Sequence, residues 1–116
     1  MNSLIKEFDR LTINKLTAYA LEIKFIELTN LLYVLFLKVD HYESTDYDLD
    51  HSQDLFPKVY RSFERTNKLL EEATKLADED CQDEYELYDL YQDYLHLKKN
   101  YNKLCEMFEE KKLNFV

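Results

Sequence analysis

The side chains with the most evident chemistry are the carboxylates and tyrosines between residues 78 and 97. This segment carries eight acidic residues and no lysine or arginine, and Tyr85, Tyr88 and Tyr91 are interleaved among the acids. Carboxylates pair well with arginine, and tyrosine buries a large area at low entropic cost, so the composition suits docking onto a basic protein surface. The alternative is a solvated helix, because acids toward a helix N-terminus and lysines toward its C-terminus are what the macrodipole favours.

A second acidic block covers residues 40–54, which contain six acidic residues and no basic one. We interpret this block as a long polar loop, where no helix dipole explains the charge, and therefore favour a functional role. In an up-down bundle the two blocks lie at opposite ends, about 35 Å apart by the helical rise. The expected partner-binding residues come from both blocks: Asp46, Asp48, Asp50, Asp83, Glu84, Tyr85, Glu86, Tyr88, Asp89, Tyr91 and Asp93.

Two patterns resemble metal sites, and we expect neither to hold a metal. Acidic or hydroxyl residues alternate from Asp46 to Asp54 as in the start of an EF-hand loop, but His51 replaces the required glycine and Pro57 the closing glutamate. Asp93 and His96 lie one turn apart, as in half of a di-iron site, but the sequence has no second such pair. No cofactor is expected either.

Composition makes an enzyme the least favoured class. The chain of 116 residues has no glycine, which excludes phosphate-binding loops, the dinucleotide fingerprint and the G-x-S-x-G nucleophile elbow. No nucleophile, base and orienting group come together by local spacing. The net charge of −9 disfavours direct binding to nucleic acid or to an anionic membrane and predicts a basic partner.

The expected fold is all-α, because glycine is absent and Pro57 is the single proline. An unbroken 3-4 spacing of apolar residues, the heptad seam from Leu87 to Phe108, predicts a long helix over residues 81–112 with Asp80 as N-cap. A second helix is expected from about Asp54 to Ala77, with Pro57 in its first turn. Between residues 16 and 39 apolar residues occupy nearly every face, which predicts a central helix packed on two neighbours.

These elements combine into a single domain, residues 1–116, with the architecture of an elongated three- or four-helix up-down bundle and a long acidic loop after the central helix. Residues 1–14 leave open a separate short helix or a kinked extension of the next one. The expected core residues are Leu16, Ile23, Leu31, Leu35, Phe63, Leu70, Leu87, Leu90, Leu97, Leu104 and Phe108.

Two functions follow from these patterns as hypotheses. The first is a stoichiometric inhibitor, of the phage anti-defence or immunity type, that occludes the nucleic-acid-binding surface of a basic partner such as a nuclease. The second is a coiled-coil assembly subunit that binds other helices through the heptad seam, with a homodimer as one form. The sequence shows no signal peptide and no apolar run of membrane-spanning length, so we expect a cytoplasmic protein without membrane contact.

Overall fold

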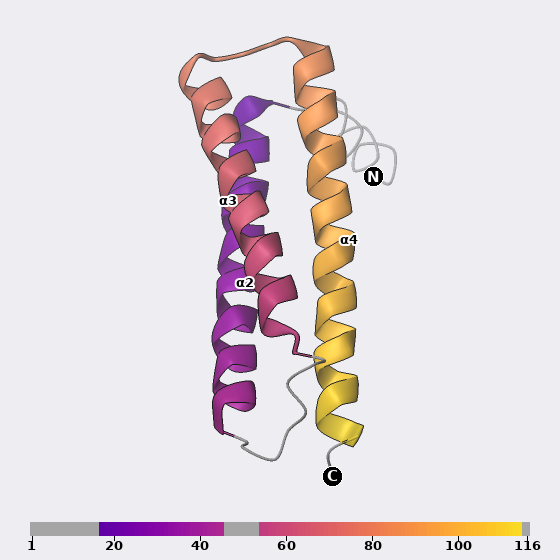
Figure 1. The fold of residues 1–116 in the computed structure, drawn as a ribbon. Helices are drawn as coiled ribbons and strands as arrows, with labels where there is room; N and C mark the ends of the chain where they lie inside the picture. The colour runs from indigo at the N-terminus through magenta and orange to yellow at the C-terminus, as the bar shows by residue number, and fades with distance from the viewer. Residues whose placement is uncertain (1–16, 46–53, 115–116) are drawn as a thin grey trace, which may run out of the picture.

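The computed structural model describes residues 17–45 and 54–114, and all three of its elements are helices. They are α2 (Ala18–Thr45), α3 (Phe56–Asp78) and α4 (Glu84–Asn114). Each helix is antiparallel to the next along the chain, so that they run down, up and down in Figure 1, and the bundle measures 54 × 36 × 18 Å. The described ranges contain no strand, which confirms the all-α prediction. A fourth helix would involve residues 1–16, which lie outside these ranges.

Helix α2 buries one face only, although its sequence is apolar nearly all round. Thr17 caps the helix by accepting a 3.0 Å hydrogen bond from the Ala20 amide. The buried residues follow a 3-4 spacing: Ala18, Leu21, Phe25, Leu28, Leu32, Leu35 and Val39. The expected core positions Ile23 and Leu31 were wrong, because their side chains are 40% and 38% exposed.

Helix α2 also continues to Thr45, well beyond the predicted end at Val39. Residues 40–45 are therefore helical, and the expected long loop over residues 40–54 is shortened at its start. The physical reason is that the buried periodicity does not stop at the last aliphatic residue. Glu43 lies one turn after Val39 on the same face and is itself buried.

Helix α3 agrees with its predicted bounds, and Pro57 occupies its first turn as expected. Its buried residues are mostly small: Val59, Ser62, Thr66 and Ala73. Small side chains allow two helix backbones to approach closely, and α2 packs more extensively on α3 than either helix packs on α4. The larger residues Phe63 and Leu70, which were expected in the core, flank this line and are only partly buried.

The heptad seam of α4 faces the interior of the bundle. Leu87, Leu90, Leu97, Leu104 and Phe108 are 3–5% exposed, as predicted. Their partners are the buried residues of α2 and α3, in one cluster around Phe25 and another around Val39. The seam is therefore occupied within the chain.

The turn before α4 corrects the predicted N-cap. Asp80 is the αL residue of a Schellman motif that ends α3, with φ of 50°, an Asp80 N–H bond to the Ala77 carbonyl and a Cys81 N–H bond to the Leu76 carbonyl. Helix α4 begins three residues later than expected. Asp83 is its N-cap residue and accepts a 2.9 Å hydrogen bond from the Tyr85 amide. No helix in the described ranges is long and apolar enough to cross a membrane.

Candidate functional site

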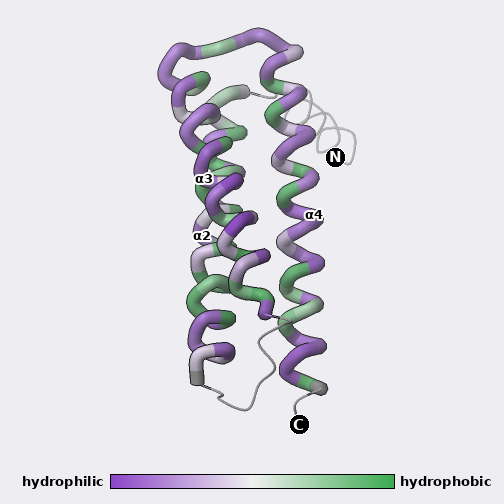
Figure 2. Tube along the Cα trace, viewed as in Figure 1, coloured by the Kyte–Doolittle hydropathy of each residue, from purple (hydrophilic) through white to green (hydrophobic). Residues whose placement is uncertain are grey.

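One end of the bundle holds the turn between α3 and α4 and the first turns of α4 (Figure 1). All eight acidic residues from 78 to 93 lie there, and we call this end the acidic end. The turn that joins α3 to α4 is mostly hydrophilic, as Figure 2 shows. Asp83 caps the N-terminus of α4, and its Oδ1 atom also accepts a 3.4 Å hydrogen bond from the Glu86 amide. Glu84 occupies the first turn, where a negative charge favours the helix.

Three of the predicted residues meet α3 in a groove of about 190 Å³, the acidic groove. It is lined by Glu72 and Leu76 from α3 and by Glu86, Asp89, Leu90 and Asp93 from α4. The lining therefore consists of four carboxylates and two leucines from two helices, with no lysine or arginine. Glu72 was missed, although the antiparallel pairing of the two helices places the end of α3 opposite the start of α4.

The carboxylates of the acidic groove have no cationic partner within the described ranges. The ion pairs within the described ranges lie outside the groove: Lys111 pairs with Glu43 and Asp54, and Lys112 pairs with Glu109. Glu86 accepts one neutral hydrogen bond of 3.4 Å, from the Cys81 thiol. The negative charge of the groove is thus uncompensated in the part of the chain that the structure describes.

The predicted tyrosines divide into two kinds. Tyr85 is 85% exposed and Tyr88 is 58% exposed, so both rings are open to solvent in the first turns of α4. Tyr91 is partly buried and its ring stacks on that of Tyr94 at 6.3 Å, which makes it a packing residue. Tyr94 in turn meets Phe25 edge-on at 5.6 Å, and burial raises the pKa of Tyr94, with Glu27 and Tyr91 adding to the effect.

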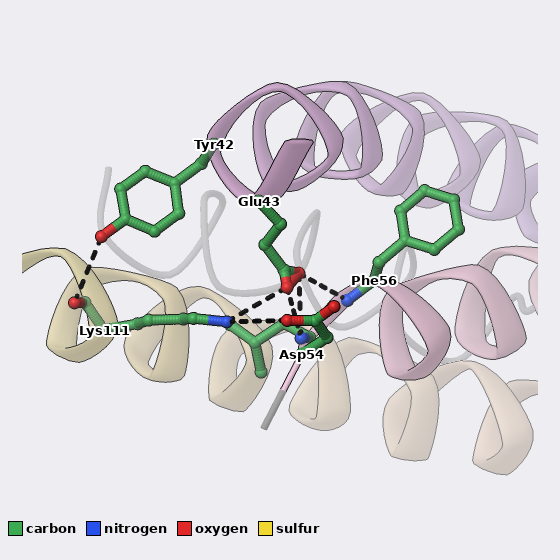
Figure 3. A network of polar contacts seen from close by, with 6 residues as sticks. Tyr42, Glu43, Asp54, Phe56 and Lys111 are labelled. Carbon is green, nitrogen blue, oxygen red and sulfur yellow. Dashed lines mark hydrogen bonds and ion pairs between the residues drawn. The ribbon is translucent and has the colours of Figure 1, made fainter. Parts of the chain in front are cut away.

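The second acidic block does not act as one unit. Asp46, Asp48 and Asp50 lie outside the described residues, so their expected role stays a prediction. Glu43 and Asp54, from the same block, meet Lys111 of α4 at the opposite end of the bundle from the acidic end (Figure 3). These two acids therefore stabilise the fold.

Glu43 is the centre of this network, which we call the Glu43 clasp. Its carboxylate accepts hydrogen bonds from the amides of Leu55 at 3.0 Å and Phe56 at 2.9 Å, and it pairs with Lys111 at 3.1 Å. Tyr42 adds a 3.5 Å hydrogen bond to the Lys111 carbonyl. Leu55 stands at the N-cap of α3 and has no capping side chain, so Glu43 supplies the cap from another helix.

A second groove, of about 230 Å³, lies farther along the same two helices and carries positive charge. It is lined by Lys58, Arg61, Ser62, Arg65, His96, Leu97 and Asn100. At its base the buried Ser62 hydroxyl accepts a 3.3 Å hydrogen bond from the Asn100 amide. The face formed by α3 and α4 is therefore polarised along its length.

The described residues contain no group of three or more histidine, cysteine or acidic side chains that could hold a metal ion. Asp93 lines the acidic groove and His96 lines the basic one, so the two point to different surroundings. Cys81 and Cys105 are free thiols.

No family model, curated protein or solved structure matches this chain.

Proposed function

We propose that the protein is a stoichiometric inhibitor of the phage anti-defence or immunity type, which occludes the nucleic-acid-binding surface of a basic protein such as a nuclease. The observation that carries this proposal is the acidic groove, where four carboxylates from two helices lie without a described cationic partner. A partner surface that binds phosphates offers arginines and lysines, and arginine pairs with carboxylates in a bidentate manner.

Two further features support docking at this end. Exposed Tyr85 and Tyr88 supply aromatic area of the kind that anchors protein interfaces. From Asp78 to Asp93 the chain holds eight acids and no lysine or arginine, which steers a basic partner and speeds association. Binding driven in this way falls as salt rises.

The second hypothesis, a coiled-coil subunit acting through the heptad seam, has less support. The seam leucines are 3–5% exposed because they pack on α2 and α3. The seam of α4 therefore offers no free apolar edge to another helix.

The test compares wild type with a variant that carries Glu86→Lys, Asp89→Lys and Asp93→Lys. A matched control carries Glu64→Lys, Glu106→Lys and Glu110→Lys, three exposed acids elsewhere, and so changes the net charge by the same amount. Each protein is used to capture partners from lysate of a low-GC bacterium at low and high salt. We expect wild type and control to retain one basic nucleic-acid-handling protein at low salt, and the groove variant to lose it.

The captured partner is then bound to labelled nucleic acid and titrated with the wild-type protein. Occlusion predicts release of the nucleic acid at one protein per partner, measured by fluorescence anisotropy. Equal capture by the groove variant and the control would overturn the proposed surface. A ternary complex that keeps its nucleic acid would overturn the inhibition mechanism. Circular dichroism of all three proteins confirms that the substitutions leave the helices folded.

A further inference from the structure

The groove that carries positive charge, which we call the basic groove, collects donors from two helices. Lys58, Arg61 and Arg65 come from α3, and His96 and Asn100 come from α4. The spacings of three and four residues place each set on one face of its helix. The two faces meet because α3 and α4 are antiparallel neighbours (Figure 1). No carboxylate lines this groove.

The three cations of the basic groove have no ion-pair partner among the residues that the structure describes. The acid next to them along α3 is Glu64, and a hydrogen bond that Tyr60 donates to Glu64 raises the pKa of Tyr60. The rings of Tyr60 and Phe36 of α2 have centroids 6.1 Å apart, which places Glu64 toward the α2 side of α3. Between Asp93 and Glu106, α4 contains three lysines and no acid. The described part of the chain therefore leaves the charge of this groove uncompensated.

The base of the basic groove is buried and is ordered by a hydrogen bond between the helices. Ser62 is 5% exposed, and its hydroxyl accepts 3.3 Å from the Asn100 side-chain amide. This contact fixes the Asn100 amide relative to α3. A hydroxyl that accepts one hydrogen bond keeps a proton to donate, and an amide nitrogen that donates one keeps a second N–H. Neutral donors therefore lie beside the three cations.

From this arrangement we infer that the basic groove binds the phosphate group of a small molecule, either as free phosphate or as a phosphate ester. An ester phosphate carries a charge of about −1.5 to −2 and three strong acceptor oxygens. Arg61 and Arg65 lie one turn apart, and the fork of each guanidinium donates two parallel hydrogen bonds to a phosphate. Lys58 adds a point charge. A carboxylate, with two oxygens and a single charge, uses fewer of these donors.

Size and charge favour a small ligand over a nucleic acid. The basic groove measures about 230 Å³, whereas pockets for drug-sized ligands measure about 300–1,000 Å³. A nucleic-acid strand that followed α3 and α4 would meet the acidic groove, on a chain whose net charge is −9. The two grooves share no lining residue, so phosphate binding is independent of the proposed inhibition.

The test is a titration of the full chain with sodium phosphate at constant ionic strength, without any partner protein. Nitrogen-edited NMR follows the Asn100 side-chain amide and the backbone amide of Ser62. We expect one-site shifts that saturate by about 10 mM phosphate, as for a dissociation constant of about 1 mM. Arg61→Gln together with Arg65→Gln should weaken binding about tenfold or more.

The matched control is Lys68→Gln together with Lys75→Gln, which removes two charges of α3 outside the groove and should leave the affinity unchanged. All four replaced side chains are exposed, so both variants should fold, and circular dichroism checks this. Absence of saturation with phosphate, or equal weakening by the arginine and lysine pairs, would overturn the proposal.

Further titrations identify the form of the ligand. Tighter binding of glucose 6-phosphate than of free phosphate would assign the group to an ester, and the reverse would assign free phosphate. Acetate should bind about tenfold more weakly than phosphate, because it offers fewer acceptor oxygens. Equal affinity for acetate would overturn phosphate recognition. A single-stranded DNA oligonucleotide that binds more tightly than both small phosphates would overturn the assignment to a small molecule.

Discussion

The two ends of this bundle use the same kind of side chain in opposite ways. In the Glu43 clasp a carboxylate is 5% exposed and is surrounded by two amides and a lysine. In the acidic groove four carboxylates lie open to solvent, with no cationic partner in the described ranges. Charge that folding has already neutralised stabilises the fold, whereas charge left uncompensated is available to a partner.

The largest expected effect comes from removing the clasp. Glu43→Ala leaves the Leu55 and Phe56 amides without their acceptor and takes one partner from the partly buried Lys111. We expect the free energy of unfolding to fall by about 3 kcal/mol, as for other broken buried pairs. Urea denaturation measures the change. Glu86→Ala, at the acidic end, is the matched control and should change stability by less than about 0.5 kcal/mol; equal losses would remove the contrast between the two ends.

A smaller loss of stability is expected at Asp83, an acid of the acidic end that also caps a helix. Asp83→Ala removes the oxygen that accepts from the Tyr85 and Glu86 amides, and should lower the free energy of unfolding by about 1 kcal/mol. Asp83→Asn keeps an acceptor and should retain most of that stability. Thermal unfolding of both variants decides this, and an alanine variant as stable as wild type would show that the cap contributes nothing.

Replacement of one residue at the acidic end, Asp80, should stabilise the protein. Asp80 has φ of 50°, a conformation that a side chain disfavours and glycine adopts freely. Asp80→Gly should raise the free energy of unfolding by about 0.5–1 kcal/mol, and it also removes one negative charge from the acidic end. Asp80→Asn, which removes the same charge but keeps the side chain, separates the two contributions. A gain of equal size in both variants would assign it to charge.

The middle of the bundle gives an effect that is confined to high pH. Burial, followed by its contact with the Cys105 side chain, raises the pKa of Tyr101 to about 12. An unfolded tyrosine titrates near 10, so the folded chain holds the proton more tightly. The stabilisation is therefore complete below pH 10 and is lost as pH rises toward 12. Tyr101→Phe should flatten this part of the stability profile, and an ultraviolet titration that shows no late-titrating tyrosine would contradict the assignment.

The fold was predictable where one face alone is apolar, and less so elsewhere. The seam of α4 stands among charged residues, so its register could be identified from spacing alone. In α2 apolar residues occupy both faces, and Ile23 and Leu31 were assigned to the core although their side chains are on the outer side. The face of α2 that becomes buried is the one that packs on the small residues of α3. The sequence of α2 alone does not identify that face.

The site was predictable in part for a similar reason. A run of acids marks the acidic end, so Glu86, Asp89 and Asp93 could be named from the sequence. Glu72 and the clasp residue Glu43 could not, because their roles depend on contacts between helices. Glu43 was read as one more charge in a loop, although it lies one turn beyond Val39 on the buried face.

The small residues on the inner face of α3 have a consequence for the order of folding. Thr66 and Ala73 let α2 and α3 form the most extensive contact among the described helices, while α4 packs less extensively on each. Cooperative units of unequal stability are expected in such an arrangement. Native-state hydrogen exchange should therefore find α4 opening first, with the pair of α2 and α3 as the last unit to exchange.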